Sequence, residues 1–571
     1  MSLAYLTAAI YVTARLWVDP GGRVVAGAGG VDQHFFEFVM AHGARVLTDL
    51  QNPLFTDRLN APMGVNMMAN TSVLGMSIPL APVTLLFGPH ITVLVAIVLS
   101  LAGTASVWYW LLSRHLVSSR FAAFIAGAFC GFAPAMLSQA IGHPNFIAQF
   151  LIPLIGWRVI KLAEPGRTVR NGLILGLLVV WQAFLNEEFL LFAAIGCLCF
   201  IVTWALAHRA EARARFATFV AGLGVATAFG VVALAYPLYF QFFGRQSYEG
   251  LPFTPSRFYA DVYSYFLFSS ESLAGDYAIA RQYAQNTSEQ NTFLGWPLMI
   301  LVVAVAVWLW RSVMARAALV TAIVFGSISL GNEIMIAKHR TGIPGPYRYL
   351  AHLPLLDMSI PSRYALMVVP MVGILLALAT ERITTRGFLR LRPSRGLRLA
   401  WYAVLAAALL PIAPTPLQTQ DARRPPHFIT SGAWREYVSE GGTLVPVPLA
   451  KNKTWSIATL RWSAISGLDF AAPGGYFLGP ASEDNRSARF TSPPRPTATL
   501  LDKVAQSGTV PDLGDADRRA AIEDLKFWRA SVVVLGEHPE QEALLATVQQ
   551  LLGPGQRVDD VWLWDVRDVV G

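Results

Sequence analysis

The chain has 571 residues, of which 54% are hydrophobic and 14% are charged, and its mean hydropathy is +0.46. This composition excludes an ordinary soluble protein, because soluble domains carry about 25% charged residues. The formal net charge is +8, but the basic residues lie in short clusters between apolar runs. We therefore interpret them as topology signals and expect no nucleic acid partner.

About eleven apolar segments are predicted to cross a membrane as helices, since a helix needs about 20 mostly apolar residues to span the hydrocarbon core. They are residues 2–18, 91–112, 121–139, 145–160, 171–186, 189–207, 216–240, 294–310, 317–331, 364–380 and 399–413. The first lacks a basic start and a small-residue cleavage site, which favours a first span over a signal peptide, and the true N-terminus could lie upstream. Cys130, Cys197 and Cys199 lie inside these runs and are expected to be packing residues.

The connections between the segments alternate in charge. Basic clusters lie at Arg114 and Arg120; at Arg158, Lys161, Arg167 and Arg170; at Arg209, Arg213 and Arg215; at Arg311 and Arg316; and from Arg382 to Arg398. The positive-inside rule places these connections in the cytoplasm. Residues 19–90, 241–293 and 332–363 and the segment from about 414 onward are then external, and we expect the functional site there.

The first external connection begins with a helical pattern. Val31–Leu50 carries apolar residues at near-helical spacing among polar ones, which predicts an interfacial helix lying on the membrane. Asp32 stands at its N-terminal end, where a helix favours an ionised carboxylate. Asp32 could be a helix cap, a base, or both. The following Asn- and Pro-rich stretch, Asn52–Asn66, predicts an ordered turn system that either faces a ligand or folds against the bilayer surface.

From about Gln418 the composition becomes polar and Pro-rich. Strand-like and helical patterns alternate over Thr443–Leu449, Ala516–Trp528, Ser531–Leu535, Glu540–Leu552 and Asp560–Val566. The pattern predicts a small extracytoplasmic α/β domain over residues 414–571, following a membrane module over residues 1–413.

Two external turns carry candidate substrate-binding residues. Asn186, Glu187 and Glu188 fall at the external end of a predicted span, where adjacent carboxylates are costly unless they face water, a cation, a basic side chain or a polar ligand. A salt-bridged structural turn is the alternative. His143 occupies the neighbouring turn and could reach the same cavity, although a lone histidine is more often structural.

Further candidates lie where the external loops meet the membrane. Arg257 and Arg363 stand beside aromatic residues, and the planar fork of an arginine suits a phosphate, with a lipid anchor as the alternative. Tyr364 follows Arg363 and His34 follows Asp32 closely, so both are also substrate-binding candidates. Glu289 could hold a site residue from behind.

Taken together, these features resemble the GT-C superfamily of membrane glycosyltransferases: a first span, an external loop with Asp32 at the head of a helix, a helical bundle and an external C-terminal domain. Asn52–Asn66, Gly142–Asn145 and Ile360–Tyr364 are similar to segments of actinobacterial members. The resemblance covers residues 1–413 in architecture. The family often has a pair of acidic residues at the head of the loop, whereas Gln33 follows Asp32 here, so a divalent cation is left open.

The resemblance implies an enzyme of the plasma membrane that transfers a sugar from a polyprenyl-phosphate donor to an envelope glycan, lipid or protein, with inversion and with Asp32 as the base. Mannose and arabinofuranose are the donor sugars that the analogy favours. A transporter or flippase of a lipid-linked sugar and a non-catalytic envelope-assembly scaffold are the alternatives. Transporters usually carry ionisable sites near the bilayer midplane, whereas here the ionisable residues gather at the external boundary.

Overall fold

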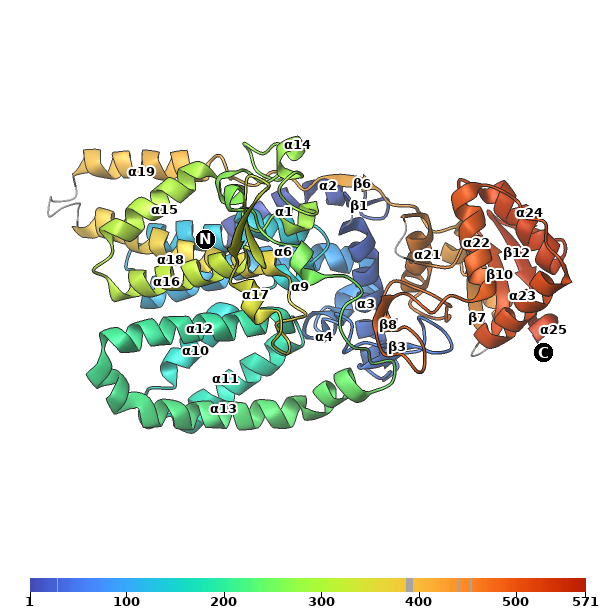
Figure 1. The fold of residues 1–571 in the computed structure, drawn as a ribbon, viewed down its shortest axis with the longest axis horizontal. Helices are drawn as coiled ribbons and strands as arrows, with labels where there is room; N and C mark the ends of the chain where they lie inside the picture. The colour runs from blue at the N-terminus through green and yellow to red at the C-terminus, as the bar shows by residue number, and fades with distance from the viewer. Residues whose placement is uncertain (28, 387–393, 439–441, 452–453, 571) are drawn as a thin grey trace.

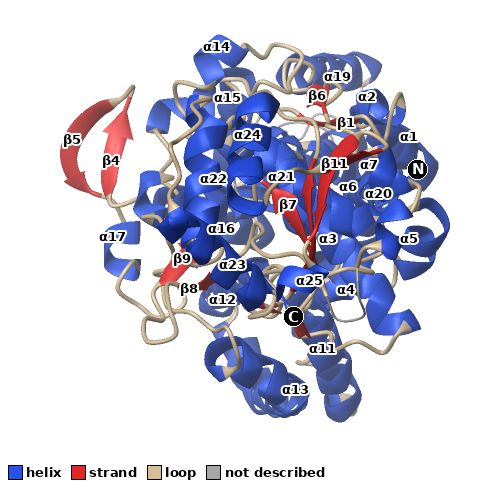
Figure 2. Cartoon of the chain, turned by 90° about the vertical axis from the view of Figure 1, so that its right-hand side faces the viewer, coloured by secondary structure: helices blue, strands red, loops and turns tan. Residues whose placement is uncertain are grey.

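The computed structural model describes residues 1–571 except residues 28, 387–393, 439–441, 452–453 and 571. The molecule is elongated, with a helical bundle at one end and a mixed sheet flanked by helices at the other (Figure 1). Viewed from the sheet end, the sheet and its helices lie in front of the bundle (Figure 2).

The bundle consists of apolar helices and short helical turns. They are α1 (Ser2–Val12), α2 (Ala14–Trp17), α6 (Pro89–His115), α7 (Arg120–Phe132), α8 (Pro134–Ala140), α9 (Pro144–Ile147), α10 (Ile152–Lys161), α11 (Thr168–Ala183), α12 (Glu187–Ala207), α13 (Arg209–Phe243), α15 (Trp296–Trp308), α16 (Val313–Ile328), α18 (Val368–Glu381) and α19 (Arg395–Leu409). Each predicted span contains one or two of these helices.

Some of these helices are long enough to span a membrane. Among the described residues, five helical stretches are long and apolar enough to cross a membrane: Pro89–His115, Arg120–Ala140, Glu187–Ala207, Arg209–Phe243 and Pro361–Thr385. Four shorter apolar helices accompany them, α1, α11, α15 and α16. The structure is therefore that of a helical protein with several apolar helices long enough to cross a membrane, and a total of about eleven crossings stays a prediction.

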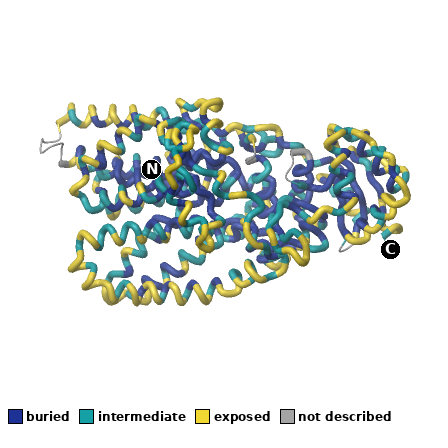
Figure 3. Tube along the Cα trace, viewed as in Figure 1, coloured by how far each residue is buried: buried dark blue, intermediate teal, exposed yellow. Residues whose placement is uncertain are grey.

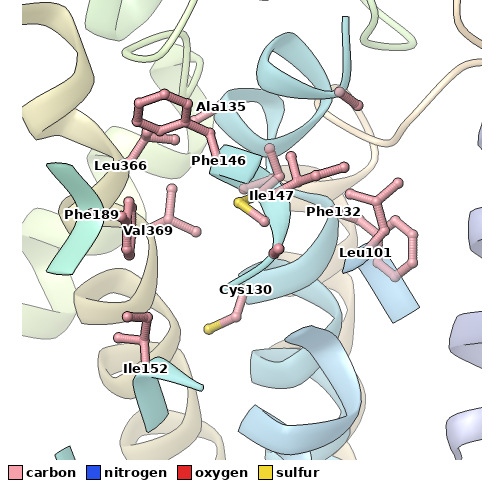
Figure 4. Packing of buried hydrophobic residues seen from close by; sticks show 14 of the residues in the cluster. Leu101, Cys130, Phe132, Ala135, Phe146, Ile147, Ile152, Phe189, Leu366 and Val369 are labelled. Carbon is pink, nitrogen blue, oxygen red and sulfur yellow. The ribbon is translucent and has the colours of Figure 1, made fainter. Parts of the chain in front are cut away.

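Close packing in the bundle depends on small residues. A Cβ atom on Gly172 of α11 would come within 2.7 Å of the Gly222 carbonyl of α13, and one on Gly176 within 2.8 Å of Phe229. Lipid tails are as apolar as the helix side chains, so association of helices in a membrane depends on close van der Waals packing. Small residues permit that close approach. Phe189 of α12 lies beside Val369 of α18 in the apolar core (Figure 4). Much of α13 is exposed on its outer side (Figure 3).

The helix predicted in the first external loop is present, but its surroundings differ from the prediction. α3 (Gly29–Thr48) is buried from Gln33 to Ala44 rather than lying on the membrane with a free polar face. It packs against α6, α5 (Ala81–Phe87) and α21 (Thr454–Ile465). The polar residues of the amphipathic pattern are covered because α21, more than 400 residues later in the chain, supplies partners for them.

Short elements make up the loops that the sequence predicts to be external. They are β1 (Arg23–Val25), β2 (Phe55–Thr56), β3 (Val65–Asn66), α4 (Leu74–Ser77), α14 (Tyr277–Ala280), β4 (Glu333–Ile336), β5 (His339–Pro344) and α17 (Tyr347–Leu350), with 3₁₀ turns at Pro255–Arg257, Val262–Phe266, Thr287–Glu289 and Pro361–Met367. In Asn52–Asn66, the asparagines hold turns: Asn60 donates to the Gly64 carbonyl at 2.8 Å. The β4–β5 hairpin projects sideways (Figure 2).

The C-terminal sheet has the order β11-β12-β10-β7. β7 (Thr443–Val447) pairs in parallel with β10 (Ala530–Leu535), and β10 and β11 (Gln556–Val558) flank β12 (Val561–Asp565) in antiparallel pairing. The remaining elements after residue 414 are β6 (Thr419–Asp421), α20 (His427–Thr430), a 3₁₀ turn at Ala433–Glu436, β8 (Leu478–Pro480), β9 (Ala488–Phe490), α22 (Pro496–Ser507), α23 (Asp515–Trp528), α24 (Gln541–Leu552) and α25 (Arg567–Val570).

A connecting segment, residues 466–495 between α21 and α22, joins the sheet to the bundle. Ala471 forms an isolated bridge with Thr443 of β7, and Ala472 forms one with Leu59 of the first external loop. The chain then continues into the β8–β9 hairpin beside the bundle. β1 and β6 also pair, which ties the first loop to the chain after α19. The C-terminal part therefore contacts the first loop at several places.

Candidate functional site

A cavity of about 410 Å³ lies where the first loop, the external ends of the bundle helices and the connecting segment meet. Its lining is Asp32, Phe35, Phe36, Met68–Val73, His143, Asn145, Phe146, Ala183–Glu188, Gln241, Tyr248, Leu251, Phe253, Met358, Arg363, Tyr476–Leu478 and Phe490. The structure thus brings together Asp32, His143, Asn186, Glu187, Glu188 and Arg363, which the sequence nominated from four separate stretches.

The Asp32 carboxylate has a partner on each oxygen. The Tyr476 hydroxyl donates to Oδ1 at 2.9 Å, and His143 Nε2 lies 3.5 Å from Oδ2. α3 begins at Gly29, so Asp32 lies inside the first turn rather than at the cap position. The side chain is 23% exposed. Asp32 is therefore held by side chains from distant elements while remaining open to the cavity.

The start of α12 supplies two carboxylates. Asn186 caps the helix, since its Oδ1 accepts from the Phe189 amide at 2.8 Å. Glu187 and Glu188 follow in the first turn, where the helix dipole favours negative charge. Gln241 of α13 donates to Glu187 at 2.9 Å. Both carboxylates face the cavity, as expected if they serve a polar ligand.

Arg363 carries positive charge into the cavity and is itself fixed by carboxylates. Its Nε and Nη2 donate to Glu289 Oε1 at 2.9 and 2.7 Å, and its Nη1 donates to Glu188 at 3.3 Å. Phe146 stacks beneath the guanidinium, 4.4 Å from the ring centroid. Glu289 is only 3% exposed, and it also accepts from Ser362 and Asn291. Glu289 thus holds Arg363 from behind, outside the cavity lining.

Aromatic residues cover one side of the cavity. The Tyr476 ring stacks on Phe490 with centroids 5.8 Å apart, and Phe490 stacks in turn on Phe253 at 6.2 Å. Tyr248 donates to the Ala69 carbonyl. The chain reaches this position through Gly474 and Gly475, which have φ values of +77° and +134°. A Cβ on Gly475 would lie 2.4 Å from the Leu59 side chain, so glycine permits the close approach.

Besides Glu289, three predicted residues do not reach the cavity lining. His34 is buried, and its Nδ1 lies 3.8 Å from Glu37 on the covered side of α3. Arg257 is exposed on its 3₁₀ turn. Tyr364 is fully buried, where it bonds Ser359 and packs on Phe192 at 4.4 Å between centroids. His34 is two positions after Asp32 on α3, which is about 200° around the helix, so its side chain points away from the cavity.

Sequence reasoning missed Tyr248, Gln241 and Tyr476. Gln241 was placed beyond the end of a predicted span, whereas α13 continues to Phe243. Tyr476 follows a Gly-Gly pair, a usable signal for a close backbone approach. That signal does not reveal which element the tyrosine approaches, since Asp32 lies 444 residues away.

An apolar groove adjoins the cavity. It has a volume of about 580 Å³ and shares Phe184 with the cavity. The start of the Asn52–Asn66 stretch, α4, α11 and α13 line it, and its other large side chains include Leu177, Trp181 and Tyr236. Phe184 therefore lines both the cavity and an apolar surface on the bundle.

The sequence does not decide whether the site uses a divalent cation. Among the residues that the structure describes, no group of three or more His, Cys, Asp or Glu side chains is arranged to hold a metal ion. The chemistry below is derived from the chain's own side chains.

Comparison with solved structures identifies neighbours of the same fold. The arabinofuranosyltransferase AftD from Mycobacteria matches 99% of this chain with 39% of its own, at 14% identity and a TM-score of 0.57. The oligosaccharyltransferase of Archaeoglobus fulgidus in its apo form matches 96% of this chain with 70% of its own, at 12% identity and a TM-score of 0.50. At these identities the likeness shows a shared fold.

No curated protein matches the sequence. One family model matches residues 47–356, which is more than half of the chain. The matched region begins within α3 and includes the turns that carry His143, Glu187 and Glu188. The chain belongs to the family described as "Domain of unknown function (DUF6311)".

Proposed function

We propose that the protein transfers a sugar from a polyprenyl-phosphate donor to an envelope glycan, lipid or protein acceptor on the external face of the plasma membrane. The observation that carries this proposal is the convergence of Asp32, His143, Glu187, Glu188 and Arg363 on one cavity. The fold shared with two glycosyltransferases supports it at a coarser level. An actinobacterial type of enzyme and an extracytoplasmic C-terminal domain are parts of the same proposal.

In the proposed reaction, Asp32 takes the proton of the acceptor hydroxyl. The acceptor oxygen forms a bond to the anomeric carbon from the face opposite the phosphate. The bond from that carbon to the phosphate oxygen breaks, and the lipid phosphate leaves with the electron pair, which inverts the anomeric centre. General-base catalysis of this kind contributes about 10² to 10⁴ in rate.

Arg363 is the proposed partner of the leaving phosphate. Three of its N–H groups already bond Glu188 and Glu289, and a guanidinium has further N–H groups to donate. The carboxylates of Glu188 and Glu289 hold the guanidinium in one orientation, so the Arg363 side chain loses little conformational entropy when a phosphate binds. The apolar groove suits the first part of a polyprenyl chain, because it is lined by apolar side chains of the bundle and shares Phe184 with the cavity.

The position of the charges favours transfer over transport. Glu187 is the first residue of α12, and Arg363 lies in the 3₁₀ turn that precedes α18. Both therefore stand at helix ends rather than in the middle of a span, where transporters usually place ionisable sites. A cavity at helix ends suits chemistry at the membrane surface.

A structure with bound donor tests the proposal. The Asp32→Asn variant in lipid nanodiscs, incubated with polyprenyl-phosphate mannose or polyprenyl-phosphate arabinofuranose, should show phosphate density beside Arg363 and chain density in the groove next to Phe184. Donor density at a distant part of the bundle, with this cavity empty, would contradict the proposed site.

A further inference from the structure

The proposed base is contacted by a residue from the far end of the chain. Tyr476 lies 444 residues after Asp32, yet its hydroxyl donates to Asp32 Oδ1 at 2.9 Å. His143 approaches the other oxygen, Oδ2, at 3.5 Å. The two contacts are made to different oxygens of Asp32, so together they fix the rotation of the carboxylate about its side-chain bonds.

The Tyr476 ring is itself fixed on several sides. Its face stacks on Phe490 with the planes 9° apart, and its ring packs edge-on against Phe35 with centroids 6.2 Å apart. The backbone on either side is also held: Gly474 forms a bridge with Ala450, and the Leu478 amide donates to Asn70 Oδ1 at 2.7 Å. The position of the hydroxyl is therefore determined before any substrate binds.

The hydroxyl remains a donor over the physiological pH range. Burial, with the neighbouring Asp32 charge adding to it, raises the pKa of Tyr476 above its ordinary value. A neutral hydroxyl donating to a carboxylate favours the ionised form of that carboxylate. The other titratable groups that line the cavity are His143, Tyr248, Glu187, Glu188 and Arg363.

We propose that Tyr476 is a positioning residue for Asp32: its hydrogen bond to Oδ1 fixes the carboxylate and turns Oδ2 toward the acceptor hydroxyl. The inference rests on the proposed sugar transfer with Asp32 as base. It also assigns a role to the connecting segment between the bundle and the C-terminal sheet, because residues after the bundle complete the site that the first loop begins.

Tyr476→Phe tests this role, since it removes the hydroxyl and keeps the stacked ring. We expect kcat to fall about tenfold at neutral pH with little change in KM, and the acid limb of the kcat/KM profile to move up by about one pH unit, because one hydrogen bond to a charged group is lost. The assay uses polyprenyl-phosphate mannose and polyprenyl-phosphate arabinofuranose as donors.

A second readout does not depend on turnover. A water-soluble carbodiimide modifies protonated carboxyl groups, so the pH midpoint of Asp32 modification, followed by mass spectrometry, should rise in Tyr476→Phe by the same amount. Tyr248→Phe is the matched control, because it removes a hydroxyl in the same cavity that bonds the Ala69 carbonyl instead. Its labelling midpoint should stay at the wild-type value.

The two readouts separate failure of the inference from failure of the proposed function. An unchanged labelling midpoint in Tyr476→Phe overturns the positioning role, whatever the activity. A raised midpoint in a protein that transfers neither sugar supports the coupling between Tyr476 and Asp32 and counts against sugar transfer. Equal midpoint shifts in Tyr476→Phe and Tyr248→Phe would assign the effect to general repacking and overturn the inference.

Discussion

Arg363 shows how a charged side chain can be both buried and available. Glu289 lies beneath it, almost fully buried, and Glu188 stands at the cavity side. A buried guanidinium is stable only when carboxylates and hydrogen bonds satisfy it. The aromatic face of Phe146 then limits how far the group can move. The residue types at this point could be predicted from Ile360–Tyr364, but the partner Glu289 comes from a separate loop.

Replacing Arg363 with Lys should lower kcat/KM by about tenfold or more while the fold survives. Lysine keeps the charge but cannot bond Glu289 through two N–H groups, and a hydrogen bond between charged groups is worth about 1.5–3 kcal/mol. Steady-state transfer kinetics measure the loss. The control is Arg257→Lys, on the exposed turn, which should behave as wild type. Unchanged apparent donor affinity in Arg363→Lys would indicate that Arg363 does not meet the donor.

At the scale of the element, α3 is held by α21 through a fully buried ion pair. Arg461 Nε donates to Glu37 at 2.9 Å, and both side chains are 0% exposed. Burial by itself raises the pKa of the Glu37 carboxyl, but Arg461 and His34 outweigh burial and lower that pKa to about 2. The contact lies one and a half helical turns from Asp32, on the same helix.

Acid should loosen the contact between α3 and α21. Because the folded pKa of Glu37 lies below its ordinary value of 4.5, the pair contributes full stability above about pH 4.5 and loses it as the pH falls toward 2. The protection of the α21 amides against hydrogen exchange, corrected for the intrinsic exchange rate at each pH, should therefore fall across this window. The double variant Glu37→Gln/Arg461→Met should not show that loss of protection, whereas Glu37→Gln alone should destabilise by about 3–5 kcal/mol, since it leaves a buried charge unpaired. Protection that is independent of pH in wild type would contradict the assignment.

Local patterns predicted most element positions, and tertiary partners account for the differences. The apolar period predicted helices in each predicted span, and strand-like patterns predicted β7, β10 and β12. The amphipathic pattern of α3 predicted a helix correctly but not its burial, because the pattern does not distinguish a bilayer from α21 as the covering surface. α22, which begins in a Pro-rich stretch at Pro496, was not predicted.

At the scale of the whole molecule, arginine clusters predicted which residues share a face, and the structure brings those residues together. Asp32, His143, Glu187 and Arg363 come from separate connections that the charge alternation assigned to the outside. Tyr476 and Phe490 could not be placed in the same way, because no rule of membrane topology tells how a C-terminal segment docks on a bundle.

Cysteine labelling can test whether the C-terminal part lies on the external side of the membrane. Ser507 is exposed at the end of α22, so a cysteine there should react with a membrane-impermeant maleimide on intact cells. The matched control is Ala210→Cys, exposed at the start of α13 in a predicted cytoplasmic connection, which should react only after permeabilisation. The reverse pattern would invert the proposed orientation.

The most direct test of the central claim is sugar transfer by purified Asp32→Asn. Asparagine keeps the size of the side chain and can still accept the hydrogen bond from Tyr476, but it cannot take a proton. If Asp32 is the base, transfer from a donor that the wild type uses should fall by about 10² to 10⁴, with thermal stability near wild type. Asp276→Asn, a cap on the external α14, should remain fully active because Asn caps as well as Asp. Full activity in Asp32→Asn would contradict the account.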